Sequence, residues 1–192
     1  KVNYKQMAVL FVSEDTIKKS TTINGNVDVE LLLPYIKVAQ DIHIHQLLGT
    51  DLYDKIQSDI TGGSLTGNYK TFTDDYIQPV LIHYALYECL PFLSYKIMNK
   101  DIVRKISETS TPASLEDIKY MREIVKNTAE YYATRLVDYL CNNNDLFPEY
   151  NTNSNGDLAP TKDTYFSGIV LDRYEQSNRI TLRSFLDASF DI

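Results

Sequence analysis

The feature that most constrains the fold is a long helical pattern over residues 114–142. Apolar side chains recur there at spacings of three and four residues, as one face of an α-helix requires: Ile118, Met121, Val125, Ala129, Tyr132, Leu136 and Leu140. Ser114 and Asp117 have the spacing of a capping box, in which two residues at the start of a helix bond each other's backbone. A helix with one apolar face must pack against other elements, so the pattern predicts a helical bundle.

Two helices are expected before it, on either side of Gly49. The first begins after Asp28 as N-cap with a kink at Pro34, or it begins near Leu33 with Pro34 in its first turn. Its apolar face is predicted to hold Leu32, Ile36, Ala39, His43 and Leu47, joined by Leu33, Gln40 and Leu48. Gly49 is expected to end this helix in the left-handed conformation that glycine adopts easily. Thr50 is expected to cap a second, short helix that carries Leu52 and Tyr53.

A third helix is expected from Thr73 to about Asn99, after a glycine-rich loop over residues 61–70. Its residues are apolar on nearly every side, so it should lie at the centre of the bundle. It also contains the longest apolar stretch, residues 77–98. Because that stretch carries charged side chains and two prolines, it indicates a core helix and not a membrane span, and we recognise no signal peptide before it.

These segments predict a mainly α fold, a bundle of about four main helices with extended arms at both ends. We divide the chain into an N-terminal arm with a short helix (residues 1–26), the bundle (27–150) and a C-terminal arm (151–192). Apolar runs at residues 7–12, 169–171 and 180–182 indicate short strands in the arms. An isolated strand needs a partner, which it must find in its own chain or in a neighbouring subunit.

The acidic composition argues against tight binding of nucleic acid. The formal net charge of the 192 residues is −7, and no basic block interrupts it. Phosphate neutralisation by clustered Lys and Arg supplies most of the affinity in nucleic-acid binding. The two cysteines, Cys89 and Cys141, lie in apolar helical patterns, which favours buried, reduced thiols over a disulfide.

No residue pattern indicates catalysis. His43 and His45 point about 200° apart on a helix, so they cannot share a metal ion, and we expect His43 to be packed and hydrogen-bonded. Gly62, Gly63 and Gly67 lack the Gly-Lys-Ser/Thr ending of a phosphate-binding loop. No recognised nucleophile, zinc or redox motif occurs. We therefore expect a protein that is not an enzyme and that has no cofactor or metal.

The C-terminal segment, residues 165–192, alternates apolar and charged side chains. Two interpretations are open: a hairpin packed on the chain's own bundle, or an arm that adds to a neighbouring subunit through main-chain hydrogen bonds. The candidate residues of an inter-subunit arm are Tyr165, Phe166, Ile169, Leu171, Arg173, Arg179, Leu182, Phe185 and Phe190.

Four short stretches carry a family resemblance: residues 23–28 (INGNVD), 33–36 (LPYI), 38–42 (VAQDI) and 47–53 (LLGTDLY). Together they resemble the helical head–tail connector (adaptor) proteins of tailed bacteriophages, in particular ring proteins of the crAss-like phages. The likeness continues more loosely to residue 150, through YIQP at 76–79 and FPEY at 147–150. Its main positions are Asn26, Asp28, Ala39, Gln40, Leu48, Gly49, Thr50, Leu52, Tyr53 and Pro148. We expect most of these residues to make the fold, with Gln40 as a hydrogen-bonding partner within or between subunits.

The resemblance implies a structural virion protein, one subunit in a ring of about twelve copies beneath the portal. Such a ring extends the DNA channel and docks the tail. Expected partners are further copies of the chain, the portal protein and neighbouring tail or neck rings. DNA would pass without sequence-specific binding, and no membrane is involved. Subunits would assemble in the host cytoplasm and lie at the head–tail interface of the virion.

Two alternatives to this role remain open. One is a cytoplasmic helical adaptor or regulatory module that has no part in a virion. The other is a different neck or tail-completion ring.

Overall fold

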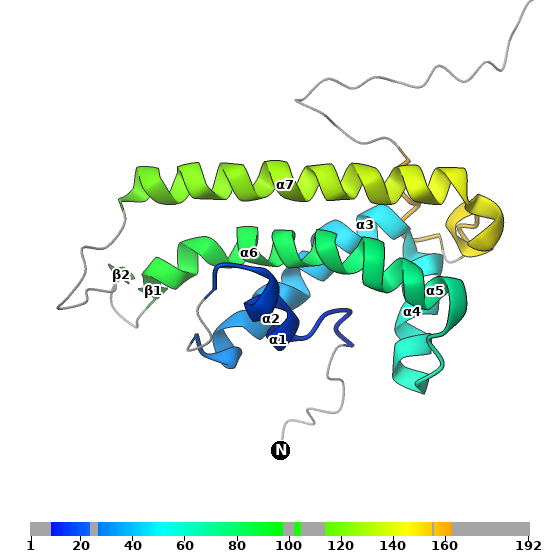
Figure 1. Ribbon diagram of the computed structural model, residues 1–192, viewed down its shortest axis with the longest axis horizontal. Coiled ribbons are helices and arrows are strands. Elements are labelled where there is room, and N and C mark those ends of the chain that lie inside the picture. Colours follow the sequence, from blue (N-terminus) through cyan, green and yellow to red (C-terminus); the bar gives the residue numbers. More distant parts are fainter. Residues whose placement is uncertain (1–8, 24–26, 98–101, 105–113, 155, 163–192) are drawn as a thin grey trace, which may run out of the picture.

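The computed structural model describes residues 9–23, 27–97, 102–104, 114–154 and 156–162 (Figure 1). Over these residues the chain is a mainly α-helical bundle, which confirms the predicted fold class. Asn26, the strands predicted at residues 169–171 and 180–182, and every candidate inter-subunit residue from Tyr165 to Phe190 lie outside the described residues.

The helices of the described residues are α1 (Glu14–Ser20), α2 (Val29–Ala39), α3 (His45–Leu48), α4 (Thr50–Gly62), α5 (Gly67–Phe72), α6 (Gln78–Ser94) and α7 (Leu115–Asn142). The π-helical segments η1 (Gln40–Ile44) and η2 (Thr73–Ile77) join α2 to α3 and α5 to α6. Two 3₁₀ turns, η3 (Asn144–Leu146) and η4 (Pro148–Asn151), follow α7. Strands β1 (Tyr95–Ile97) and β2 (Ile102–Arg104) pair antiparallel.

Helix α6 is the centre of the bundle, as its apolar sequence predicts. It packs along α7, and α2 crosses it (Figure 1). Its buried side chains include Val80, Leu81, Ile82, Tyr84, Ala85, Leu86 and Cys89. Because these residues point in several directions around the helix, α6 supplies apolar contacts to both neighbours at once.

Helix α7 begins and ends close to the predicted residues. Ser114 Oγ accepts a hydrogen bond from the Asp117 N–H at 3.1 Å, and Asp117 Oδ2 accepts one from the Ser114 N–H at 2.9 Å. This reciprocal pair is the predicted capping box. The two halves of α7 differ in burial: the second half packs on the core through Ala129, Leu136 and Leu140, whereas Ile118 is its one buried residue before Ala129.

The third predicted helix has different ends from those expected. The helical path already begins at Gly67, and its first segment ends at Phe72, which is fully buried in the core. The loop before it is therefore shorter than the predicted 61–70. The path stops at Ser94, where the sequence predicts Asn99, since Tyr95 is extended and opens β1. Aromatic and β-branched residues favour such an extended conformation.

The π segment η1 changes which residues of the α2–α3 path face the core. An α-helix turns every 3.6 residues, and the sequence therefore placed His43 and Leu47 on the buried face. The wider π turn adds a residue and shifts that face by one position. The fully buried residues are now Ile36, Ala39, Gln40, Ile44 and Leu48, while His43 and Leu47 are only partly buried. Beyond Ala39 the prediction is correct for Gln40 and Leu48, whereas the fully buried Ile44 was not expected on this face. Before Ala39, Leu33 was expected on the face and is exposed.

An aromatic cluster closes the end of the bundle where α7 stops. The ring centroids of Tyr76 and Tyr139 are 4.0 Å apart, and those of Phe72 and Phe147 are 4.8 Å apart. Pro148 opens η4, which suits proline because the first residue of a helical turn needs no N–H partner. The turn buries Tyr150 and brings the chain back beside α4.

Candidate functional site: a polar clasp for both terminal segments

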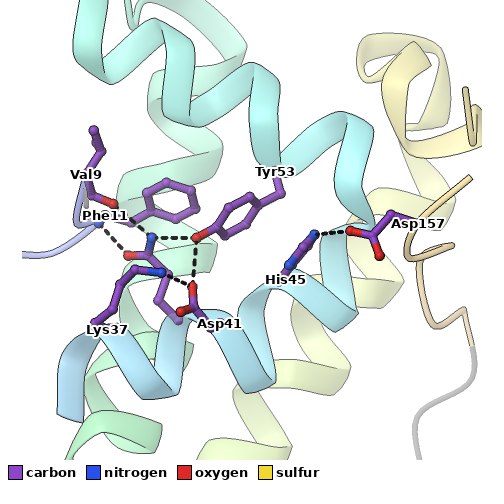
Figure 2. A network of polar contacts seen from close by, with 8 residues as sticks. Val9, Phe11, Lys37, Asp41, His45, Tyr53 and Asp157 are labelled. Carbon is purple, nitrogen blue, oxygen red and sulfur yellow. Dashed lines mark hydrogen bonds and ion pairs between the residues drawn. The ribbon is translucent and has the colours of Figure 1, made fainter. Parts of the chain in front are cut away.

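Residues 39–53 form the corner between η1, α3 and α4 (Figure 2). Its apolar members Ala39, Leu48 and Leu52 are fully buried and make the core of this corner. Its other members contact segments far away in the sequence, and we call five of them the clasp: Gln40, Gly49, Thr50, Asp51 and Tyr53. They hold the N-terminal segment (residues 9–12) and the C-terminal strap (the described residues of 152–162).

Gln40 binds the backbone of the N-terminal segment through its side-chain amide. Its Oε1 accepts a hydrogen bond from the Phe11 N–H at 2.9 Å, and its Nε2 donates to the Val9 carbonyl at 2.9 Å. A side-chain amide carries both an acceptor and a donor, so a single amide satisfies both groups. The described part of the predicted strand at residues 7–12 is not a β-strand. Its pairing groups are met by a side chain of the same subunit.

Tyr53 completes the surroundings of the buried Gln40 amide. Its hydroxyl accepts a hydrogen bond from Gln40 Nε2 at 2.9 Å and donates one to Asp41 Oδ1 at 3.3 Å. Asp41 also pairs with Lys37, and the Tyr53 ring packs on Phe11 with centroids 5.1 Å apart (Figure 2). Burial raises the pKa of Tyr53, which keeps its donating proton in place. Of the two roles open to Gln40, the structure therefore has the one within the subunit.

A glycine is required at position 49, both by the backbone conformation there and by the atoms that lie close to it. Its φ of 74° and ψ of 161° belong to a region that residues with a side chain rarely occupy. A Cβ at this position would lie 2.7 Å from Pro160 Cδ and 2.9 Å from Pro160 N. The positive φ is as predicted, but the ψ lies outside the expected left-handed cap. Gly49 ends α3 and directly precedes α4, and the ordinary cap conformation does not make that corner.

Thr50 is not the cap of α4 that the sequence predicts. Gly49 occupies the N-cap position, and Thr50 is the first helical residue. The Thr50 hydroxyl accepts a hydrogen bond from the Leu158 N–H at 3.1 Å, donates to Asp157 Oδ2 at 3.2 Å and lies 2.9 Å from His45 Nε2. The Thr50 N–H donates to the Leu158 carbonyl at 2.9 Å. The strap thus supplies the partners that an N-terminal turn of a helix lacks.

Asp51 is a clasp residue that the sequence did not reveal. Its Oδ2 accepts hydrogen bonds from Thr152 Oγ1 at 2.7 Å, Ser154 N at 2.9 Å and Ser154 Oγ at 2.8 Å. In the sequence, an acidic residue in a first helical turn is explained by the helix dipole alone. The partners of Asp51 lie more than 100 positions later, so no local pattern could have identified them.

His43 and His45 serve different contacts. His43 Nε2 lies 3.0 Å from Glu88 Oε1, and its ring stacks on Tyr84 with centroids 3.8 Å apart, which confirms the predicted packed histidine. Burial lowers the pKa of His43, against the opposing effect of Glu88. Glu88 Oε2 is also 3.8 Å from Arg122, so this contact joins η1, α6 and α7. His45 instead faces Thr50 and Asp157, 4.0 Å from the carboxylate (Figure 2).

Within the described residues, no three His, Cys, Asp or Glu side chains gather to form a possible metal site. Cys89 and Cys141 are free thiols, and burial raises the pKa of Cys89 to about 12, which keeps it protonated. No helix in the described part of the chain has the length and apolar character needed to cross a bilayer.

A comparison with known protein families finds a match that includes most of the clasp. Residues 44–159 match the model of a family of unknown function, DUF6712. The chain belongs to this family. The DUF6712 match begins at the end of η1 and ends at Ala159 in the strap, so it contains every clasp residue except Gln40. No curated protein and no solved structure matches the chain.

Proposed function

We propose that this DUF6712 chain is a structural subunit of the head–tail connector ring of a tailed bacteriophage, between portal and tail. The observation that carries the proposal is the position of residues 39–53. The part of the sequence that resembles connector ring proteins most specifically also holds both terminal segments. A subunit that reaches its neighbours with its ends needs those ends to leave the bundle from a fixed place, and the clasp supplies it.

The polar groups of the clasp also support a structural role. Gln40 is fully buried and makes three hydrogen bonds inside the subunit. Thr50 and Asp51 are likewise engaged with the strap. Groups used in this way stabilise one chain path and are not presented to a substrate. We propose that the subunit acts by assembly, without catalysis, cofactor or metal.

The charge of the chain fits a channel through which DNA moves. With a net charge of −7, the subunit repels the phosphate backbone at long range. A channel wall that does not attract the DNA lets the DNA pass without trapping it. Portal protein, neighbouring tail or neck rings and further copies of this chain are the partners that this role requires.

The first test is the mass of the full chain by light scattering, alone and after mixing with the portal protein of the same phage. We expect a portal-dependent ring of about twelve copies, because closed rings form when each copy makes two heterologous contacts. A persistent monomer or dimer that forms no complex with portal would contradict the proposal. That result would favour a helical adaptor outside the virion.

A second test removes residues 165–192. We expect a folded bundle that fails to assemble, because the clasp and the strap up to Lys162 remain in the shortened chain. Circular dichroism and thermal melting report folding, and light scattering reports assembly. If the shortened chain unfolds, the removed residues belong to the core and their proposed role between subunits is wrong.

A further inference from the structure

The corner around Gln46 and Thr50 is a docking site for an extended segment, and the strap of the same chain occupies it. The Thr50 N–H donates to the Leu158 carbonyl at 2.9 Å, and the Leu158 N–H donates to the Thr50 hydroxyl at 3.1 Å. The Thr161 N–H donates to the Gln46 carbonyl at 3.0 Å. The corner thus binds main-chain groups of residues 157–162, which we call the distal strap.

The corner also fits two side chains of the distal strap. Pro160 lies over Gly49, where a Cβ would come within 2.7 Å of Pro160 Cδ. Asp157 Oδ2 accepts a hydrogen bond from the Thr50 hydroxyl at 3.2 Å and lies 4.0 Å from His45 Nε2 (Figure 2). Recognition by main-chain groups and a few side-chain positions is how proteins bind extended segments of other chains. An identical segment from a second copy would make the same contacts.

The distal strap is held loosely by its own subunit. Pro160 and Thr161 are partly buried, and its four other residues are exposed. It therefore removes little apolar surface from water, and its exposed hydrogen bonds contribute little to stability. A bend at Gly156, with a φ of 66°, separates it from residues 152–154, which bind Asp51. Because glycine changes its backbone conformation easily, the strap can straighten there when it leaves the corner.

The covalent link decides which copy of the strap occupies a corner. In a dilute chain the tethered strap has a local concentration on the order of millimolar at its own corner, so it is retained. In a ring, the next copy holds an identical strap at a comparable distance from that corner. Exchange then replaces each contact by the same contact, and this is why swapping an identical element is a route to assembly of low free-energy cost.

We propose that in the assembled ring the distal strap of each copy occupies the corner of the next copy. This inference rests on the proposed ring and names the segment that joins its subunits. Each copy gives one strap and receives another, a head-to-tail contact that continues until the ring closes. Residues 152–158 span about 20 Å when extended, so the corners of adjacent copies lie within that distance.

Exchange also brings the candidate inter-subunit residues to the neighbouring copy. Residues 163–192 follow the distal strap directly, so they continue from the corner of the copy that receives it. The strap alone buries little surface and binds weakly. The residues that follow it supply the remaining affinity, in agreement with the loss of assembly expected when residues 165–192 are removed.

Cross-linking of the full chain distinguishes an exchanged strap from a retained one. Gln46→Cys and Thr161→Cys are introduced together in a Cys141→Ser background, and a short bismaleimide links them wherever a strap lies on a corner. The dilute, unassembled chain should give an internally linked monomer, whereas assembled rings should give a ladder of covalent oligomers. Asp54→Cys with Ser58→Cys, both exposed and one turn apart on α4, is the matched control. It should give internal links in both states.

A second measurement asks whether the strap must leave its own corner for assembly. Chains with Gln46→Cys and Thr161→Cys are linked internally at high dilution, purified and then concentrated. Their concentration for half-assembly should rise by about tenfold or more, because the link prevents exchange and removes the tethered contact between copies. Internally linked chains with Asp54→Cys and Ser58→Cys should assemble as the unlinked protein does. Circular dichroism checks that both linked chains are folded.

Four results would overturn the inference. Rings of the expected mass that give internal links alone would keep the proposed function and reject the exchange. A ladder that stops at dimers would show reciprocal exchange within pairs, which builds no ring. Chains linked at Gln46→Cys and Thr161→Cys that assemble like the linked control would show that the strap stays on its own corner. If no oligomer forms under any condition, including with portal, the proposed function fails together with the exchange.

Discussion

The N-terminal segment and the C-terminal strap are held by neighbouring residues of one clasp, but in different ways. Phe11 and Val12 are buried, and the Gln40 amide that binds the Phe11 N–H and the Val9 carbonyl belongs to a residue with no exposed surface. The strap lies on the surface, and its contacts are mainly polar ones to Thr50 and Asp51. Buried apolar contacts contribute much more to stability than exposed hydrogen bonds. The N-terminal segment is therefore part of the core, whereas the strap can open locally while the bundle stays folded.

This difference bears on the proposed assembly. A subunit that docks on a portal needs a rigid body and segments that can reorder on contact. The clasp provides one segment of each kind at the same corner.

Gln40→Leu should lower the free energy of unfolding by about 3 kcal/mol, because the Phe11 N–H and the Val9 carbonyl lose their partner. Urea unfolding followed by circular dichroism measures the change. Gln46→Leu, at an exposed position on α3, is the matched control and should change stability little. Equal effects of the two substitutions would mean that the N-terminal segment is not held as part of the core.

Gly49→Ala should cost about 2 kcal/mol through its backbone conformation. The new methyl group also meets Pro160, which gives the strap a reason to move away. Hydrogen exchange should therefore show faster exchange of the Thr161 amide, which donates to the Gln46 carbonyl in the native protein. Unchanged protection of Thr161 would show that the strap does not depend on the glycine.

Asp51→Asn should weaken the strap and leave the bundle almost unchanged. Replacing the carboxylate removes charge from three hydrogen bonds, an effect of about 1 kcal/mol on local opening. The Ser154 amide should exchange several times faster, while the urea midpoint moves little. Asp54→Asn, one turn further along α4, is the control. A large shift of the midpoint would place the strap in the cooperative core.

Acid should act on the bundle through His43 and His83. Burial lowers the pKa of both from 6.5, so below that pH the unfolded chain binds protons that the native chain does not. Stability then falls as pH decreases through this window, by at most about 1.4 kcal/mol per pH unit for each histidine. Urea unfolding between pH 7 and 5, compared with a His43→Gln, His83→Gln variant, measures it. A variant with the same pH dependence would exclude these two histidines as the cause.

The sequence predicts those features of the fold that are determined by residues close together in the chain. The capping box of α7, the central position of α6 and the need for glycine at position 49 follow from neighbouring residues. The burial of Ile44 in place of His43 could not be predicted, because nothing in the local sequence pattern marks a π turn. The strand-like run of residues 7–12 was recognised as needing a partner, but a side-chain amide was not foreseen in that role.

The contacts of the clasp were the least predictable part of the site. Gln40 lies 29 positions from Phe11, and Asp51 lies 103 positions from Ser154. Threonine is a common helix-capping residue, so the sequence predicts a cap at Thr50. In the structure its hydroxyl instead bonds to Asp157 and Leu158, which lie beside it. Such pairs are set by the path of the whole chain, so the sequence could indicate that these residues matter without indicating their partners.

Native-state hydrogen exchange of the full chain tests most directly whether one clasp holds two segments of different stability. The Phe11 amide should exchange only through global unfolding, with the same free energy and denaturant dependence as amides of α6. The Leu158 and Thr161 amides should exchange at a lower free energy that low concentrations of denaturant do not change. If Phe11 exchanges as readily as Thr161, or if all three amides follow global unfolding, the distinction between a core segment and a releasable strap is wrong.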